Sequence, residues 1–364
     1  MKLLFISGNL TDGGAQRVIS VVSSYLAEHG HDVSLFLFSR SDKEYPISEK
    51  VKITSISANF EEYKKVSLVQ RLKFIRKHLK DYKPDVGVGF LEGGYALYLA
   101  SFGMRFAKIA SARIDPKVLF AAKGFRSKIN KMWFSSADAV VLQTESQKNH
   151  VTKKMLKRCV VIPNPVSERA LMAEKSSYDC GCRFVMAGRL SDQKNYPLVL
   201  EAVRIVKATH PDVHVDIYGK GAEEQKLSGM IADMGISDNV SLKGWTQDTV
   251  GEYLQHDAYI MSSDFEGMPN ALMEAMAAGL PCISTDCDTG PSDLITDGEN
   301  GYLIPVGDAA ALAEKMVKII EMTPDERRAI GRAARENIKE NYNGEVICKK
   351  WESEFLSFQR MESL

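Results

Sequence analysis

The chain has no long hydrophobic run and no crowding of cysteines. No stretch approaches the roughly 20 consecutive apolar residues that a membrane-spanning helix needs, and only four apolar residues follow Lys2 before Ser7, too few for a signal peptide. Six cysteines are scattered along the chain; only Cys180 and Cys182 stand close, with no second pair at zinc spacing. We therefore predict a cytoplasmic protein with free thiols.

Two familiar phosphate-binding motifs are missing from the glycine-rich residues 7–17. Gly8 and Gly13 have the spacing of a P-loop, but Gly14 and Ala15 stand where its lysine and its Ser or Thr belong. Without those two groups the segment has no machinery for nucleoside triphosphate hydrolysis. A dinucleotide-binding G-x-G-x-x-G is absent as well, which disfavours a nicotinamide dehydrogenase.

Net charge is also absent, but the zero total hides a division. Residues 1–170 hold 28 Lys and Arg against 15 Asp and Glu, a net +13, and residues 171–364 hold 19 against 32, a net −13. A basic half joined to an acidic half indicates that one half faces an anionic partner. A length of 364 residues favours two domains.

Short β-rich runs alternate with amphipathic helical patterns along the whole chain, which predicts α/β domains with parallel sheets. The expected strands are residues 2–7, 32–38, 51–56, 85–90, 108–112, 139–143, 160–163, 183–187, 213–218, 240–242, 258–261 and 281–284. Pro163 and Pro165 mark a boundary between domains at 1–163 and 164–345. We expect the last helix, within residues 346–364, to pack back onto the first domain.

Residues 265–274, Phe-Glu-Gly-Met-Pro-Asn-Ala-Leu-Met-Glu, are the most informative stretch. They follow an expected strand, Gly267 frees a turn, and Pro269 suits the first turn of a helix. The amides and the dipole of a helix start favour an anion. Glu266 before the helix and Glu274 inside it can each accept hydrogen bonds from a sugar diol.

A second strand-to-helix loop, residues 187–197, carries the complementary cations. Arg189 offers a planar fork and Lys194 a mobile point charge, the pair expected around a diphosphate. Taken singly, each has the alternative of being an ordinary surface cation. Two acids and two bases on strand-end loops of one domain favour a shared site.

Four features together resemble the family-4 retaining glycosyltransferases of GT-B fold. They are Gly13-Gly14, Gly188-Arg189-x4-Lys194, Glu266-x7-Glu274, and the pattern Gly-Pro…Asp-Gly-x-Asn-Gly-Tyr-Leu-Ile-Pro in residues 290–305, in the expected order over nearly the whole chain. The resemblance implies two Rossmann-like domains facing across a central cleft, with a nucleotide sugar held mainly by the second.

The same resemblance implies roles for individual residues. Arg189 and Lys194 bind the donor diphosphate, Glu266 the transferred sugar and Glu274 the ribose hydroxyls; Glu266, Arg189 and Lys194 are the catalytic candidates. The remaining donor-site candidates are Gly267, Met268, Pro269, Asn270, Gly13 and Gly14, and those flanking the base are Gly219, Gly244 and Trp245. Glycines at 13 and 14 let the backbone approach the diphosphate, the alternative being a mere tight turn.

The mechanism expected from this set needs no metal and no cofactor. Negative charge builds on the leaving diphosphate, so cations and a helix start stabilise the transition state more than the ground state. Retention of configuration is implied by the resemblance alone. Family members often carry a histidine in the loop that here spans residues 111–116 and has none. Glu92, Arg113 and Asp115 are the acceptor-side candidates.

Two basic stretches, residues 64–80 and 117–134, mix cations with aromatic and aliphatic residues. They suit helices resting on anionic lipid; the equal alternative is that the apolar residues face the core and the cations are solvated. Nucleic acid is disfavoured because no binding module is present. A peripheral position at the inner face of the plasma membrane is the resulting hypothesis.

The sequence thus predicts a hexosyltransferase that moves a hexose or N-acetylhexosamine from a nucleotide sugar, UDP-linked, to a saccharide acceptor. A lipid-linked acceptor in cell-surface polysaccharide or lipopolysaccharide biosynthesis is expected. Two alternatives remain open. One is a nucleotide-sugar epimerase of GT-B fold, which needs no acceptor, and the other is a non-catalytic sugar-nucleotide-binding scaffold.

Overall fold

A computed structural model describes residues 1–11, 13–90, 92–121, 124–178 and 181–361. The chain divides into two compact units, the first made of Met1–Pro165 and Gly344–Leu364 and the second of Val166–Asn343. The sequence analysis places the domain boundary at 163 and the returning helix after 345. Cys180, the neighbour of Cys182 in the sequence, lies outside the described residues.

The first unit is built on a seven-stranded parallel sheet with the order β3-β2-β1-β4-β5-β6-β7. Its strands are β1 Lys2–Ser7, β2 Asp32–Ser39, β3 Lys52–Ser57, β4 Val86–Phe90, β5 Ala107–Ser111, β6 Ala139–Leu142 and β7 Cys159–Val161. The central strands are apolar on both faces, as parallel strands covered by helices on each side must be. All seven correspond to expected strands, with bounds that differ by at most two residues.

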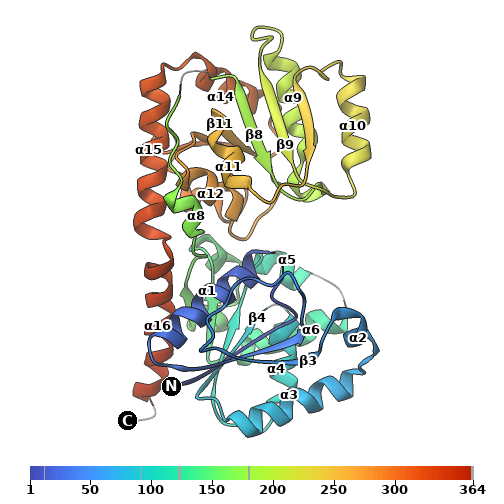
Figure 1. Cartoon of the computed structure of the whole chain (residues 1–364), viewed down its shortest axis with the longest axis vertical. Helices are drawn as coiled ribbons and strands as arrows, with labels where there is room; N and C mark the ends of the chain where they lie inside the picture. The colour runs from blue at the N-terminus through green and yellow to red at the C-terminus, as the bar shows by residue number, and fades with distance from the viewer. Residues whose placement is uncertain (12, 91, 122–123, 179–180, 362–364) are drawn as a thin grey trace. The chain divides into compact units, whose positions relative to one another are not determined.

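Helices cover both faces of this sheet. They are α1 Gly14–Glu28, α2 Phe60–Lys65, α3 Leu68–Tyr82, α4 Glu92–Ala100, α5 Pro116–Ala121, α6 Phe125–Ser136, α7 Lys153–Leu156 and α16 Gly344–Met361, with a 3₁₀ turn η1 at Ser146–His150. The last helix, α16, lies beside α1, so the two ends of the first unit's sequence share one face (Figure 1). There Trp351 and Phe355 join Val18 and Val22 in one buried cluster.

The second unit has a six-stranded parallel sheet with the order β10-β9-β8-β11-β12-β13. Its strands are β8 Arg183–Ala187, β9 His214–Tyr218, β10 Val240–Gly244, β11 Ala258–Met261, β12 Cys282–Thr285 and β13 Tyr302–Ile304. Its helices are α8 Glu168–Met172, α9 Tyr196–Val206, α10 Glu224–Asp233, α11 Thr249–Leu254, α12 Asn270–Ala277, α13 Pro291–Leu294, α14 Ala309–Glu321 and α15 Pro324–Asn341, with a 3₁₀ turn η2 at Asp192–Lys194. Sequence analysis missed β13, whose three residues are too short for an alternation pattern.

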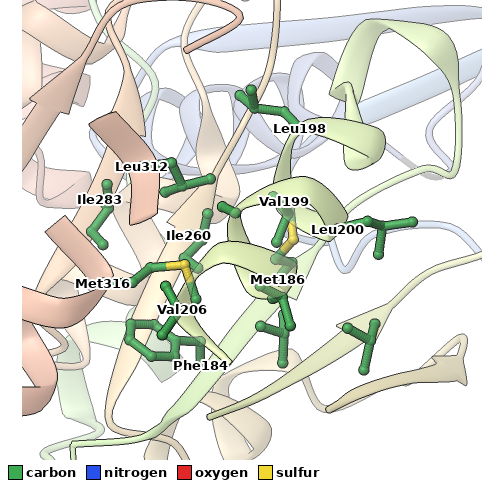
Figure 2. Close-up of a cluster of buried hydrophobic side chains, with 14 of the residues drawn as sticks. Phe184, Met186, Leu198, Val199, Leu200, Val206, Ile260, Ile283, Leu312 and Met316 are labelled. Atoms are coloured by element: carbon green, nitrogen blue, oxygen red, sulfur yellow. The ribbon is translucent and has the colours of Figure 1, made fainter. Parts of the chain in front are cut away.

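The core of the second unit lies where α9 and α14 pack on the sheet. Figure 2 shows Phe184 and Met186 of β8 and Ile260 of β11 beside Val199 of α9 and Leu312 of α14. A separate cluster on the other face includes residues of α12 and α15. This double covering holds the sheet rigid, so the loops at the carboxyl ends of its strands project from a fixed frame.

The structure decides between the two interpretations of the basic stretch 117–134 at its last aromatic residues. Trp133 and Phe134 of α6 are buried against the sheet of the first unit, where they add to the core. Residues 122–123 lie outside the described part. No helix in the described part of the chain is both long enough and apolar enough to cross a bilayer.

Candidate active site

Lys194 and Glu266 form a close ion pair at the carboxyl end of the second sheet. The distance from Lys194 Nζ to Glu266 Oε1 is 2.6 Å, and the two side chains are 20% and 10% exposed. Lys194 ends the η2 turn after β8, and Glu266 lies in the loop after β11, the neighbouring strand. Ser263 donates a second hydrogen bond to the same Glu266 oxygen, 2.7 Å long. A carboxylate held this way has lone pairs left to accept bonds from hydroxyl groups.

Hydrogen bonds between neighbouring loops hold the pair in place. Ser262 donates from its hydroxyl to the backbone oxygen of Lys194 over 2.7 Å, and the amide of Asp264 donates to Gln193 over 2.9 Å. Thr289, which follows β12, donates its hydroxyl to the backbone oxygen of Glu266. The carboxylate and the ammonium are therefore preorganised, because the ends of three neighbouring strands, β8, β11 and β12, fix them rather than one flexible loop.

A cavity of about 320 Å³ in the same unit is lined by the other predicted cation and by two of the three predicted base-flanking residues. It adjoins Lys194, because Gly188 lines it and a Cβ at Gly188 would lie 3.2 Å from Lys194 Cε. Arg189, Gly219 and Trp245 line it; Arg189 is exposed and Trp245 is 64% exposed. An exposed indole offers a stacking face, and a guanidinium offers a fork for phosphate oxygens. The arrangement therefore suits a nucleotide.

Two backbone features and one side-chain bond shape this cavity. The amide of Gly219 donates to the carbonyl of Gly244 over 2.8 Å, and a Cβ at Gly219 would lie 1.8 Å from the carbonyl oxygen of Gly188. Glycine is required there because the loop that carries Arg189 passes too close for any side chain. Tyr218 donates its hydroxyl to Glu252 over 2.6 Å, and burial together with this bond raises the pKa of Tyr218.

The start of α12 carries the remaining donor-site candidates of the second unit. Gly267, Met268 and Pro269 are buried and Asn270 begins the helix. The first turn contains no acidic residue, so no carboxylate on the helix itself occupies its positive end. Glu274 lies half-buried in the second turn.

Gly13 and Gly14 belong to the first unit. Gly13 precedes α1 with a φ of +125°, a backbone conformation that glycine adopts readily, and Gly14 is the first residue of the helix. Gly13 is exposed. The tight turn is present; the approach of these glycines to a donor diphosphate stays a prediction.

The three acceptor-side candidates separate into two places in the first unit. Glu92 and Arg113 line a cavity of about 410 Å³ at the carboxyl ends of β1, β4 and β5. Asp115 is buried, and its Oδ1 lies 2.7 Å from Nδ1 of His150 in η1. Sequence analysis missed His150, because 35 residues separate it from Asp115 and no local pattern connects them.

Two family models match the chain in sequence, and they meet near the boundary between the two units. The model described as Glycosyltransferase Family 4 matches residues 12–169, and the one described as Glycosyl transferases group 1 matches residues 169–337. Together they cover every strand except β1, which precedes residue 12, and every candidate residue named above.

Relatives and solved structures agree with this assignment. The amylovoran biosynthesis glycosyltransferase AmsD of Erwinia amylovora is 27% identical, over 96% of this chain and 97% of the relative. A Campylobacter jejuni enzyme named GalNAc-alpha-(1->4)-GalNAc-alpha-(1->3)-diNAcBac-PP-undecaprenol alpha-1,4-N-acetyl-D-galactosaminyltransferase is 27% identical, over 88% of this chain and 89% of the relative.

Among solved structures, sucrose-phosphate synthase from Thermosynechococcus elongatus superimposes with a TM-score of 0.81 over 100% of both chains at 18% identity. A mutant of TarM from S. aureus, in complex with Fondaparinux, alpha-GlcNAc-glycerol and UDP, gives 0.68 at 25% identity, over 79% of this chain and 58% of that chain.

These likenesses, with the two parallel sheets and their strand-end sites, define a glycosyltransferase of GT-B fold. Within that class the chain belongs to the family-4 glycosyltransferases, a group that includes enzymes of bacterial surface-polysaccharide biosynthesis.

Proposed function

We propose that this glycosyltransferase moves a hexose or N-acetylhexosamine from a UDP-linked donor to a saccharide acceptor, with retention of configuration and without a metal. The observation that carries the proposal is the Lys194–Glu266 pair, 2.6 Å apart, at a strand end next to the Arg189–Trp245 cavity. A carboxylate for sugar hydroxyls, cations for a diphosphate and an aromatic face for a base are the groups that a nucleotide sugar requires.

Binding of the donor would use these groups in order along the ligand. The base stacks on Trp245, the diphosphate lies between Arg189, Lys194 and the start of α12, and Glu266 accepts from the hydroxyls of the sugar. The TarM structure holds UDP, and that likeness supports the choice of nucleotide.

During transfer, the bond between the anomeric carbon and the diphosphate oxygen breaks, and negative charge grows on the leaving group. Lys194 and Arg189 stabilise that charge in place of a divalent cation. Glu266 orients the Lys194 ammonium, and the loop hydrogen bonds hold both at fixed positions, which lowers the cost of reaching the transition state.

For the acceptor we propose a saccharide of a surface polysaccharide or lipopolysaccharide, carried on a lipid at the cytoplasmic face of the plasma membrane. The C. jejuni relative is named for an undecaprenol-linked acceptor, and the amylovoran relative for polysaccharide biosynthesis. The net charge of +13 over residues 1–170 suits a peripheral position on anionic lipid.

A thermal-shift panel tests the donor assignment. The full chain is heated with UDP, GDP, ADP and CMP sugars, each with and without EDTA. A UDP sugar at 100-fold over its Kd should stabilise the fold by about 2.7 kcal/mol, seen as a rise in Tm of several degrees. EDTA should change nothing.

Arg189→Ala should remove most of the shift with UDP sugars. Arg204→Ala is the matched control, because Arg204 is an exposed arginine of the same unit, paired with Glu201 on α9. A rise in Tm with a sugar of another nucleotide, or no rise with any of them, contradicts the donor assignment. Product analysis by NMR then reads the anomeric configuration, and inversion would contradict retention.

A further inference from the structure

Arg113 is a buried cation at the wall of the cavity in the first unit. It is 8% exposed and lies just after β5. Its guanidinium donates to the hydroxyl of Ser111 over 2.7 Å and to the side-chain oxygen of Asn164 over 2.9 Å. The rings of Phe90 and Trp351 lie 5.2 and 5.5 Å from the guanidinium carbon. These contacts fix the guanidinium plane and exclude water from its faces.

The charge of Arg113 is not compensated. In the described part of the chain no carboxylate lies within ion-pair distance of it, and its hydrogen-bond partners Ser111 and Asn164 are neutral. Burial lowers the pKa of Arg113, which expresses the cost of the charge in this position. Arginine nevertheless stays protonated at neutral pH, so the site holds an unpaired positive charge.

Two buried donor atoms of residues that line the cavity have no hydrogen-bond partner among the described residues. They are Nη2 of Arg113 and Nε1 of Trp133, both in residues that line the cavity and both buried. Guanidinium and indole nitrogens can only donate, so a ligand that satisfies them must supply hydrogen-bond acceptors, such as the oxygens of an anionic group. Leaving such donors unsatisfied is costly in the absence of a ligand.

The position of Trp133 is built into the backbone around it. A Cβ at Gly94 would lie 2.7 Å from Trp133 Nε1, and a Cβ at Gly89 would lie 3.2 Å from its Cζ2. The indole therefore packs on bare backbone of β4 and α4. Tyr95 and Phe134 also line the cavity, whose volume of about 410 Å³ is large enough for a monosaccharide unit.

We propose that this cavity binds the acceptor through an anionic group, a carboxylate or a phosphate, whose oxygens pair with Arg113. The sugar ring next to that group packs against Trp133 and Tyr95. Glu92, the other charged residue among the described lining residues, accepts from a sugar hydroxyl at the exposed side. Calling the ligand the acceptor rests on the proposed function; the anion preference of the cavity does not.

Calorimetric titration of the full chain with three probes tests the anion preference. The probes are 4-nitrophenyl β-D-glucuronide, 4-nitrophenyl phosphate and, as the neutral match of the first, 4-nitrophenyl β-D-glucoside. One or both anionic probes should bind at least about tenfold more tightly than the glucoside, because an anionic probe forms a hydrogen-bonded ion pair with Arg113 and the neutral glucoside does not. Preference for the glucuronide identifies a sugar carboxylate, and preference for the phosphate a phosphorylated acceptor. Equal binding of all three in the wild-type chain overturns the proposal without any variant.

Variants then locate the preference. Arg113→Met should abolish it and Arg113→Lys should retain part, whereas Arg105→Met, at an exposed arginine of the same unit, should leave it unchanged. An anion preference that survives in Arg113→Met also overturns the proposal. The UDP-induced rise in Tm distinguishes failure of the proposed function from failure of this inference. An anion preference without any nucleotide binding contradicts the proposed function alone. Nucleotide binding without an anion preference contradicts only this inference.

Discussion

At the scale of single residues, function depends on pairs that are charged yet shielded. Lys194 and Glu266 are both mostly buried, and each would be costly alone in that position. Their pairing, with Ser263 as a further donor to Glu266, compensates the cost of burying the two groups. Arg113 shows the opposite situation, a buried cation with neutral partners only, and for that reason we assign it a ligand.

Lys194→Ala should slow sugar transfer by about 10²-fold or more, the cost of losing a charged group that stabilises a transition state. The measurement is kcat with a UDP sugar and a working acceptor, beside Tm to confirm folding. Lys339→Ala, at an exposed lysine of α15, is the control and should leave kcat unchanged. A loss of less than about fivefold in the folded Lys194 variant would remove the assigned role, given the expected size.

At the scale of elements, β9 carries a buried charge cluster that ties it to its neighbours. Asp216, in the middle of β9, lies 2.9 Å from Nε2 of His256 and 3.2 Å from Nε2 of His214. The ammonium of Lys243 on β10 and the guanidinium of Arg183 on β8 lie 3.8 Å away. Burial by itself would raise the pKa of Asp216, but the hydrogen bond from His256 and the surrounding positive charges lower it below 3.8.

Asp216→Asn should therefore lower the free energy of unfolding at pH 7 by about 3 kcal/mol, the cost of breaking a buried charge network. A carboxylate with a lowered pKa in the folded state stabilises above its unfolded pKa of 3.8, and that contribution is lost as the pH falls through the folded value. The difference in the free energy of unfolding between wild type and variant, measured by urea unfolding, should therefore become smaller below about pH 4. Asp212→Asn, at an exposed aspartate just before β9, is the control. If this difference in the free energy of unfolding does not depend on pH, Asp216 stabilises the fold through its packing and not through its charge.

At the scale of the whole molecule, the division of charge is the property to explain. In the first unit, α3 presents exposed Val69 and Phe74 together with exposed Lys73, Lys77 and Lys80. Cations beside apolar side chains suit attachment to the surface of anionic lipid. This surface is what remains of the membrane hypothesis after Trp133 and Phe134 of the second basic stretch proved to be core residues.

Reversing the three lysines of α3 to glutamate should reduce flotation with phosphatidylglycerol-containing vesicles by about tenfold or more, because each lysine near anionic lipid contributes on the order of 1 kcal/mol. Vesicles of phosphatidylcholine alone should bind neither protein. Reversal of Lys153, Lys154 and Lys157, which are exposed at α7 of the same unit, matches the charge change at another site and should have little effect. If both triple variants lose flotation equally, the attraction is a general property of the basic half and α3 has no special part.

Twelve of the thirteen strands could be predicted from the sequence, because apolar runs between amphipathic helices have a local signature. The two loops that carry Lys194 and Glu266 could also be predicted to follow strands, while their part in donor binding stays a prediction. The missed strand β13 lacked that signature, because it has only three residues.

The sequence by itself therefore determined the α/β class, the two parallel sheets and the loops that carry chemistry, because these follow from local periodicity and turn residues. Only the tertiary structure decided which side chains meet. Lys194 reaches Glu266 across 72 residues, and Asp115 meets His150 across 35. Arg113 lies against Trp351 of the last helix, which packs on the first unit. Strand order and the return of the chain bring these residues together, and no local pattern encodes either.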